Sequence, residues 1–210
     1  GFLAENQREH IVEGHRAKAL AISLYHDIKN DTTDLRRISN WETNKINHID
    51  SLLDLLQKKS PDNDTSFSIH AAWLVFVNKF FQNSGTYEQL KNSGSLRYFK
   101  QDLINSMLKY ENIMAETKLR EEAEVTKLEQ RVIPFVQERI NYEFVYTLLR
   151  NLPIPRNIYV KLKDQNTIDL MINEAIEIKL VGLRRRDLYN QLYALAIEIL
   201  KKLKDNYNPE

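Results

Sequence analysis

Apolar residues recur through the N-terminal part of the chain at the spacing of one face of an α-helix. The steps between them are three, four or sums of these, as in Ala17, Ala21, Leu24, Ile28, Leu35, Ile38, Ile49, Leu52 and Leu56. The pattern predicts helix over residues 2–59. Its phase continues through the polar residues 30–34, NDTTD, although these also resemble the start of a helix. The segment is therefore either one long helix or two nearly collinear helices.

The next segment, FSIHAAWLVFVNKFF, is apolar on nearly every side. Such a run is typical of a buried helix, and it predicts helix over residues 67–82. It is shorter than the ~20 residues that a helix needs to cross a bilayer. We expect it to be a core element of the fold.

A long helical pattern follows over residues 95–150. Its middle, ETKLREEAEVTKLEQR, mixes charges of both signs, which predicts a helix exposed to solvent on most sides. Pro134 lies within this pattern. Because proline lacks a backbone donor, we expect a kink near residue 134, over residues 130–133. The two prolines of NLPIPRN then end the pattern.

The last pattern predicts helix over residues 166–205, with Asn166 or Thr167 as its N-cap. Its apolar positions recur at helical spacing, namely Ile168, Ile172, Ile176, Leu188, Leu192, Leu195, Ile199 and Leu203. Gly182 falls inside this helix. A helical glycine is less favourable than alanine by ~1 kcal/mol. Gly182 therefore either separates two helices or merely weakens one.

These patterns together predict an all-α fold. No alternation of period two persists along the chain, and only five glycines and five prolines interrupt its 210 residues. Few turns between long helical patterns favour an elongated, mostly antiparallel bundle of long helices that is coiled-coil-like in part. We expect residues 1–210 to form a single helical domain.

The stretch GTYEQLKNSGSLRYF raises the question of a phosphate-binding loop, because it holds two of the five glycines. A phosphate loop needs Gly-x4-Gly-Lys-Ser/Thr after a strand, and neither that spacing nor a strand pattern occurs here. Thr86 with Gln89 instead resembles a capping box at the start of a short helix. Gly94 fits the left-handed residue that commonly ends a helix. We interpret the stretch as a hinge between helices.

The charge and cysteine content exclude several classes of partner and chemistry. The sequence contains 30 Lys and Arg residues and 29 Asp and Glu residues, which gives a net charge of +1. Nucleic-acid-binding domains usually carry a basic surface, so we expect no nucleic-acid partner. The chain has no cysteine, which excludes disulfides, thiolate metal sites and a cysteine nucleophile.

The histidines do not follow a known metal-binding pattern. Zinc-binding helices place two histidines one turn apart, whereas His10 and His15 of EHIVEGH lie five residues apart with Glu13 between them. Di-iron bundles use Glu-x-x-His pairs. The residues three positions before His10, His15, His26, His48 and His70 are Gln7, Val12, Ser23, Lys45 and Phe67. We expect no metal ligand and no cofactor.

Two further groups of residues leave alternatives open. The basic cluster LRRRD, residues 183–187, either holds a phosphate or lipid headgroup or pairs with nearby acids. The aromatic residues either line a ligand pocket or belong to the core; they are Trp41, Trp73, Phe76, Phe80, Phe81, Phe99, Tyr142 and Phe144. Serine-nucleophile motifs such as Gly-x-Ser-x-Gly are absent from the sequence. We therefore expect no catalytic residues and no enzymatic activity, and the ligand-binding residues stay unknown.

Several short stretches in the first 115 residues resemble a group of uncharacterised proteins from Bacteroidota. The shared stretches are AEN-x-RE near the start, an Asp-x3-Asp pair, IDSLL, and Tyr-Glu-x-Leu-Lys-x-Ser-Gly-x-Leu. The matching residues are Leu3, Ala4, Glu5, Asn6, Arg8, Glu9, Asp27, Asp31, Ile49, Asp50, Ser51, Leu52, Leu53, Tyr87, Glu88, Leu90, Lys91, Ser93, Gly94 and Leu96.

The resemblance implies a location for the protein. Members of the group begin with a short basic segment and one transmembrane helix, which this chain does not contain. A basic segment before that helix would leave the following domain outside the cytoplasm. The resemblance therefore implies that this chain is the soluble part of an inner-membrane, single-pass protein whose domain faces the periplasm.

We expect a non-enzymatic, membrane-tethered periplasmic interaction or scaffold domain, whose partner is another protein or a second copy of the chain. The long helices would supply the binding surface, because helices with thin apolar stripes gain stability by adding further helices. The alternative is a ligand-sensing helical bundle domain that is coupled to the membrane.

Overall fold

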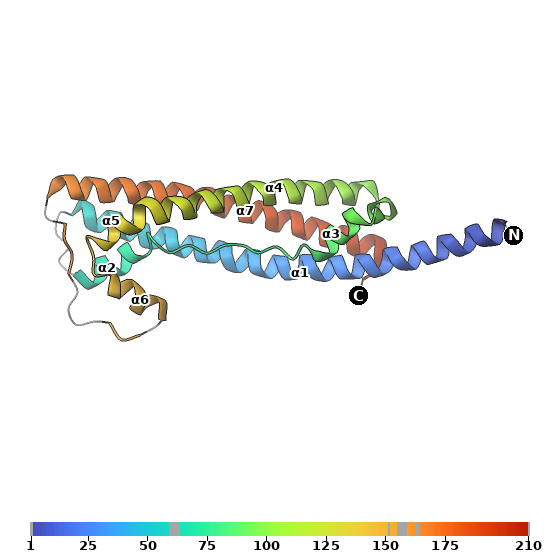
Figure 1. Cartoon of the computed structure of the whole chain (residues 1–210), viewed down its shortest axis with the longest axis horizontal. Helices are drawn as coiled ribbons and strands as arrows, with labels where there is room; N and C mark the ends of the chain where they lie inside the picture. The colour runs from blue at the N-terminus through green and yellow to red at the C-terminus, as the bar shows by residue number, and fades with distance from the viewer. Residues whose placement is uncertain (1, 59–63, 151, 155–158, 163, 210) are drawn as a thin grey trace. The chain divides into compact units, whose positions relative to one another are not determined.

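The computed structural model describes residues 2–58, 64–150, 152–154, 159–162 and 164–209, with side chains from residue 12 onward. The described residues form helices, and the β-structure among them is one isolated bridge between Ile140 and Val160. The α-helices, shown in Figure 1, are α1 (Phe2–Gln57), α2 (Asp64–Ala72), α3 (Gly85–Asn92), α4 (Gln101–Lys127), α5 (Ile133–Gln137), α6 (Tyr142–Arg150) and α7 (Gln165–Tyr207). A 3₁₀ helix covers Ser95–Tyr98, and a π-helical turn covers Leu128–Val132. The prediction of an all-α bundle is confirmed.

Helix α1 is one continuous helix, which settles the first open alternative. Within the polar segment 30–34, the hydroxyl groups of Thr32 and Thr33 donate to the carbonyl of Lys29, at 2.7 and 3.4 Å. These bonds run backwards along the helix, so the two threonines continue it rather than cap a new one. Every apolar position of the predicted stripe from Ala17 to Leu56 is buried. The helix ends at Gln57, two residues before the predicted end, and residues 59–63 lie outside the described residues.

Helix α7 is also continuous and passes through Gly182 without a break. Its N-cap is Asp164 rather than Asn166 or Thr167, because the Asp164 carboxylate accepts from the backbone N–H and the hydroxyl of Thr167, both at 2.8 Å. In the N-terminal half of the predicted stripe, Ile168 and Ile172 are half-buried and pack against the core of unit 2, whereas the prediction for Ile176 is wrong. Ile176 is exposed, and the buried positions are Met171, Ala175 and Ile178. The C-terminal half is confirmed at Leu188, Leu192, Ile199 and Leu203.

The prediction of one buried helix over residues 67–82 is wrong. Helix α2 ends at Ala72, and residues 76–83 form an extended segment without regular secondary structure (Figure 1). Side chains of the long helices form hydrogen bonds with backbone groups of this extended segment. Arg185 donates to the Asn78 carbonyl at 3.0 Å, and Asp31 accepts from the Asn83 N–H at 2.9 Å. Because these tertiary bonds replace helical ones, the segment stays extended despite its apolar composition.

The predicted helical pattern over residues 95–150 is divided into several helices. As expected from Pro134, the regular α-helix is disturbed just before it, by the π-helical turn Leu128–Val132. Helix α5 then ends, and α6 begins after Asn141, whose side chain accepts from the Glu143 N–H at 3.1 Å. Both local signals, a proline and an Asx N-cap, were present in the sequence.

The stretch from Gly85 to Phe99 forms the predicted hinge. Gly94 has a left-handed conformation with φ of +67°, and it separates α3 from the 3₁₀ helix. The predicted capping box is wrong, since α3 begins after Ser84 and Thr86 lies in its first turn. The Thr86 N–H donates instead to Asp27 at 3.2 Å, and its hydroxyl bonds to Ser23 at 3.0 Å. Helix α1 therefore supplies the cap.

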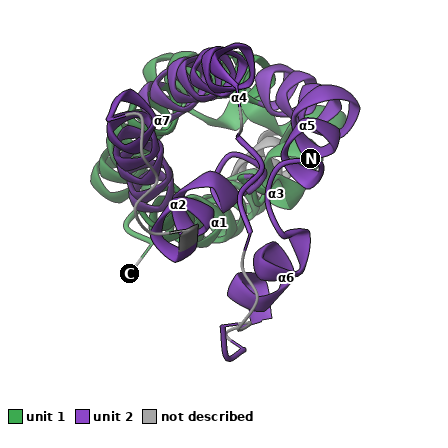
Figure 2. Ribbon diagram, turned by 90° about the vertical axis from the view of Figure 1, so that its left-hand side faces the viewer, with its two compact units in different colours: residues 1–38, 80–117, 188–210 green, residues 39–79, 118–187 purple. Residues whose placement is uncertain are grey.

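The described chain forms two compact units, coloured separately in Figure 2. Unit 1 comprises residues 1–38, 80–117 and 188–210, and unit 2 comprises residues 39–79 and 118–187. Each unit has a hydrophobic core of its own. That of unit 1 includes Leu24, Leu90 and Ile199, and that of unit 2 includes Leu52, Phe67 and Val132.

In both units α7 runs opposite to the other long helices. Within unit 1, Lys202 of α7 lies beside Asp102 of α4, and Glu198 lies beside Ser106. Within unit 2, Arg185 bonds to Glu42 of α1, and Lys179 forms an ion pair with Asp50. Helices α1 and α4 run in the same direction as each other, as the colours in Figure 1 show.

Two carboxylates of α1 hold the start of α3 in unit 1. Asp27 and Asp31 are four residues apart and lie on the same face of the helix. Asp31 is fully buried and accepts from the backbone and side-chain amides of Asn83, at 2.9 and 2.8 Å, and from the hydroxyl of Tyr110 at 3.0 Å. Burial raises the pKa of Asp31, while the bonds from Asn83 and Tyr110 oppose that rise. The Asp-x3-Asp pair therefore has a structural role.

Candidate functional site

A network of four buried charges occupies the middle of unit 2. The Arg185 guanidinium donates to Glu124 through one terminal nitrogen and to Glu42 and the Asn78 carbonyl through the other. Lys45 donates to the second oxygen of Glu124 at 2.9 Å. All four charged side chains are fully buried. Two acids and two bases balance each other, which is the condition under which buried charges are tolerated.

The network joins three helices and the extended segment. Glu42 and Lys45 come from α1, Glu124 from α4 and Arg185 from α7. Removing one member of such a network leaves an uncompensated buried charge, which typically costs about 3–5 kcal/mol. Because any other register of the helices would separate these partners, the network constrains which faces of the helices meet in unit 2.

The Glu42 carboxylate fills the space that a side chain at position 182 would need. A Cβ atom added to Gly182 would lie 2.6 Å from Glu42 Oε1 and 3.4 Å from Ile46 Cγ1. Glu42 Oε1 has no hydrogen-bond donor among the described residues. Burial raises the pKa of Glu42, while the charges of Arg185 and Lys45 oppose that rise. Gly182 is therefore the residue that makes room for a buried carboxylate.

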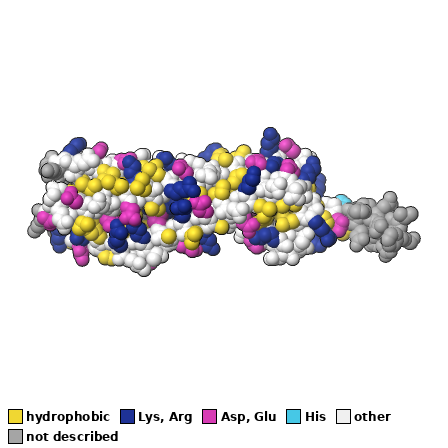
Figure 3. Space-filling view, turned by 90° about the horizontal axis from the view of Figure 1, so that it is seen from above, with side chains coloured by type: hydrophobic (Ala, Val, Ile, Leu, Met, Phe, Trp, Pro, Cys, Tyr) yellow, Lys and Arg dark blue, Asp and Glu magenta, His cyan; other side chains and the backbone are white. Residues whose placement is uncertain are grey.

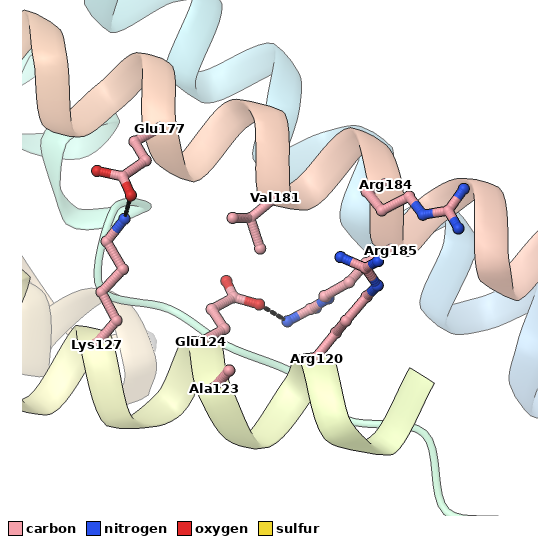
Figure 4. A pocket seen from close by; sticks show the side chains of 8 residues that line it. All are labelled: Arg120, Ala123, Glu124, Lys127, Glu177, Val181, Arg184 and Arg185. Carbon is pink, nitrogen blue, oxygen red and sulfur yellow. Dashed lines mark hydrogen bonds and ion pairs between the residues drawn. The ribbon is translucent and has the colours of Figure 1, made fainter. Parts of the chain in front are cut away.

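A pocket of about 190 Å³ opens beside this network, between α4 and α7 (Figure 4). Its lining residues are Arg120, Ala123, Glu124, Lys127, Glu177, Val181, Arg184 and Arg185. In Figure 4 the Arg185 guanidinium reaches from α7 to Glu124, and Arg120 extends from α4 toward α7. The wall of the pocket is therefore formed in part by the buried network itself.

A second group of ion pairs lies at the edge of the pocket. Lys127 forms an ion pair with Glu177, which is also bound by Arg131 at 2.9 Å. Arg131 binds Glu174 as well, at 2.6 Å. The hydrogen bond from the Lys127 ammonium is the main cause that lowers the pKa of Glu177, and Arg131 contributes less. Both acids at this edge therefore have basic partners within unit 2.

The basic cluster LRRRD is divided among different environments. Arg185 is buried and pairs with acids of α1 and α4, as the structural alternative predicted. Arg184 is exposed and lines the pocket, and Arg186 is half-buried. Glu42, Lys45 and Glu124 were not predicted from the sequence as members of the site.

A histidine pair connects α1 and α2 in unit 2. The Nδ1 atoms of His48 and His70 are 2.9 Å apart, so one ring donates a hydrogen bond to the other. Trp73 stacks on His48 with 4.4 Å between ring centroids and an interplanar angle of 10°. Burial lowers the pKa of both imidazoles, and the proximity of His70 lowers that of His48 further. The pair favours the neutral form.

The aromatic residues considered as pocket candidates do not share one environment. Phe80, Phe99 and Phe144 are buried in the cores. Trp41, Trp73, Phe76 and Tyr142 are half-buried, and Phe81 is exposed. The pocket beside the charge network is lined by none of these eight residues.

In the histidine-containing segment near the N-terminus, the side chain of Glu13 has hydrogen-bond partners within unit 1. Glu13 accepts from the Tyr98 hydroxyl at 3.0 Å and from Arg97 at 3.3 Å. The side chain of His10 lies outside the described residues. Among the residues that were described, no group of three or more His, Cys, Asp or Glu side chains is arranged to hold a metal ion.

Comparison of the chain with models of protein families, with curated proteins and with solved structures found no match. Within the described part of the chain, none of the helices combines the length and the apolar character that a membrane span requires.

Replacing Gly182 by alanine is expected to destabilise the protein, by about 1–3 kcal/mol as for other overpacked sites. The gain in helix propensity, about 1 kcal/mol, is outweighed because the new methyl group would collide with Glu42, whose other oxygen is fixed by Arg185. Gly14 is the matched control, since it is an exposed glycine of α1 with nothing within 4 Å of an added Cβ. Gly14→Ala should stabilise. Urea denaturation of both variants measures the difference.

The collision itself can be isolated in a double-mutant cycle. In a Glu42→Ala background, Gly182→Ala should become stabilising, because the colliding carboxylate is gone. An alanine at position 182 that stabilises the otherwise native protein as much as one at position 14 would refute the steric explanation.

The His48–His70 pair is expected to make the protein less stable in mild acid. Because the pKa of each histidine is lower in the folded than in the unfolded protein, the unfolded state binds more protons as the pH falls through ~6.5, and stability decreases with it. The free energy of unfolding should be constant near pH 8 and fall toward pH 5.5. Urea denaturation at intervals of pH measures this profile.

The double variant His48→Gln/His70→Gln should flatten the profile, whereas His15→Gln, at an exposed position of α1, should leave it unchanged. If the double variant retains the full acid loss between pH 8 and 5.5, the histidine pair is not its source.

Proposed function

We propose that this chain is a non-enzymatic interaction domain that binds a protein through the exposed side of α6. The observation that carries the proposal is an apolar surface formed by Tyr146, Leu149 and Leu152, which we call the α6 surface. Tyr146 and Leu149 are 56% and 63% exposed. Three residues apart on a helix, they lie on the same face.

Helix α6 is apolar on both of its sides. Phe144, Val145 and Thr147 are buried in unit 2, so one side of the helix is already used for packing. The Leu152 N–H bonds to the Thr147 carbonyl at 3.0 Å, which places Leu152 next to the end of the helix. Single exposed apolar residues are common on protein surfaces, but adjacent ones mark interaction sites. The α6 surface is such a set, and Ile154 extends it along the chain.

The charges of the protein support a binding role over catalysis and over nucleic-acid binding. The four buried charges of unit 2 neutralise one another and hold helices together. On the face shown in Figure 3, basic and acidic side chains are interspersed with apolar ones rather than gathered by sign. A net charge of +1 agrees with this mixture. A mixed surface suits contact with proteins better than contact with a polyanion.

We further propose that the domain is tethered to the inner membrane by a transmembrane helix that the chain does not contain, and that it faces the periplasm. The support for this location is the resemblance of residues in the first 115 positions to membrane-anchored proteins of Bacteroidota. Protease treatment of spheroplasts that express the full-length gene tests it. Degradation without lysis is expected, and protection until lysis would contradict the proposed location.

A second candidate function is ligand sensing, and the pocket between α4 and α7 favours it. The pocket is bordered by Glu124 and Arg185, which connect to α1 through Lys45 and Glu42. A molecule bound there would contact side chains whose partners lie on other helices of unit 2. This arrangement is one that a sensor needs, because the ligand must interact differently with two states of the protein.

Replacing Leu149 by serine is expected to weaken binding through the α6 surface while leaving the fold intact. The side chain is mostly exposed, so its loss removes little packing within unit 2. Sedimentation analysis of the purified chain measures self-association, for which we expect at least a tenfold rise in Kd. Leu119→Ser is the matched control, because Leu119 of α4 is 69% exposed and lies outside the α6 surface.

Because the chain has no cysteine, a single Leu149→Cys variant can carry a photo-crosslinker at this surface alone. We expect it to capture a second copy of the chain or one defined partner protein, in proportion to their concentration. A Leu119→Cys variant with the same crosslinker should not. Equal crosslinking from both positions, or none from Leu149→Cys, would remove the α6 surface as the binding site.

A further inference from the structure

Two histidines of unit 2 hold ring nitrogens close enough together to share a metal ion. His48 lies on α1 and His70 on α2, and their Nδ1 atoms are 2.9 Å apart. Both side chains are half-buried, so small ions can reach them from solvent. We propose that His48 and His70 together bind one divalent transition-metal ion through these two atoms, with Cu²⁺ preferred over Zn²⁺. The pair shares no residue with the α6 surface or with the pocket between α4 and α7, so this inference goes beyond the proposed function.

The hydrogen bond between the two rings shows that the ligand atoms are accessible to a metal ion. Imidazole is the commonest metal ligand in proteins, and it binds through the lone pair of the neutral ring. In a bond between two Nδ1 atoms, one nitrogen donates its proton and the other accepts with its lone pair. The accepting ring therefore already has an unprotonated Nδ1. The donating ring can carry its proton on Nε2 instead, because neutral imidazole has two tautomers. Both lone pairs then become available with no net release of a proton.

The separation of the two nitrogens selects the metal. Nitrogen ligands lie ~2.0–2.1 Å from ions of this kind. Two ligands at neighbouring corners of a square plane are then ~2.9 Å apart, whereas two corners of a tetrahedron are ~3.3–3.4 Å apart. The observed separation of 2.9 Å matches the square plane. Cu²⁺ and Ni²⁺ favour this geometry, and Cu²⁺ binds such ligands more tightly than Ni²⁺ or Zn²⁺.

Aromatic side chains restrict one of the two rings. Trp73 stacks on His48 with 4.4 Å between ring centroids and an interplanar angle of 10°. Trp73 is itself packed against Trp41 and Phe76, at 5.8 and 5.5 Å between centroids. A ligand whose ring is held by packing loses less conformational freedom on binding. The His70 ring then needs only to turn about its Cβ–Cγ bond to direct Nδ1 at the ion.

The protein supplies two ligands and leaves the other coordination positions open. Among the residues that the structure describes, no third His, Cys, Asp or Glu side chain joins the pair to form a metal-binding group. Water, or oxygen and nitrogen atoms of a small molecule, would fill the remaining positions. Structural zinc sites have four protein ligands. With only two, we expect an ion that joins α1 to α2 and exchanges with the solution.

Two tryptophans next to the pair report on metal binding. Trp41 and Trp73 are the only tryptophans of the chain, and bound Cu²⁺ or Ni²⁺ would quench their fluorescence. The test titrates the whole chain, freed of metal with EDTA and dialysed at pH 7.5, with CuCl₂, NiCl₂ or ZnCl₂. Saturable quenching by one equivalent of Cu²⁺ is expected. Thermal unfolding provides a readout for all three ions, because a ligand of the native state raises Tm. Cu²⁺ should raise Tm most, and a larger rise with Zn²⁺ would overturn the preference for Cu²⁺.

The single variants His48→Gln and His70→Gln should each raise the Kd for Cu²⁺ at least tenfold, because each removes one of two ligands. The matched control is His15→Gln/His26→Gln, which removes two imidazoles from exposed positions of α1. It should change Kd less than twofold. Thermal unfolding without metal shows that each variant is folded before it is titrated.

A measurement on the unaltered protein does not depend on how the variants fold. The EPR spectrum of the chain loaded with one equivalent of Cu²⁺ should have the axial form of a tetragonal site, with splitting from two nitrogens. A spectrum without nitrogen splitting, or equal Kd values for the native chain and both pair variants, would mean that the ion binds elsewhere. The absence of quenching and of any rise in Tm with all three ions would also overturn the proposal.

Discussion

Unit 2 depends on the partners of one buried guanidinium, whose two terminal nitrogens donate to groups of three other segments. Arg185 has no exposure to solvent, and its hydrogen-bond partners come from α1, from α4 and from the backbone of the extended segment. A charge in such a place is tolerated only while every partner is present. The positions of Glu42, Glu124 and the Asn78 carbonyl are therefore constrained together. Lys45 completes the balance by neutralising the second oxygen of Glu124.

Other features of unit 2 follow from this constraint. Gly182 leaves the space that the Glu42 carboxylate fills. This steric requirement explains why a residue of low helix propensity occurs in the middle of α7. The extended conformation at Asn78 exposes the carbonyl that Arg185 requires. The pocket between α4 and α7 lies against Glu124 and Arg185. A ligand there would act on groups that hold three helices, whereas a protein bound to the α6 surface would contact a helix outside the network.

Unit 1 solves a similar problem with hydrogen bonds instead of ion pairs. Asp31 is buried without a basic partner among its described contacts, and its oxygens accept from the amides of Asn83 and from the Tyr110 hydroxyl. Asp27 binds the first turn of α3 from the same face of α1. Carboxylates of α1 thus position backbone outside the long helices in both units. In unit 2 the effect is indirect, because Glu42 binds the Arg185 side chain that donates to the Asn78 carbonyl.

Apolar periodicity alone determined the long helices α1 and α7, because burial of one stripe repeats every few residues and needs no knowledge of the partner. The same periodicity held a sign of the charge network that the prediction did not use. Glu42 and Lys45 lie between Ile38 and Ile49 at steps of four, three and four residues. The buried stripe therefore continues through two charged side chains. The extended conformation of residues 76–83 and the pairing of Glu42 with Arg185 were decided by the tertiary structure. Both depend on groups far apart in the sequence, which local propensity does not register. The steric need for glycine at position 182 was also decided by the tertiary structure, because only the packed helices show that a carboxylate of α1 lies against this Cα.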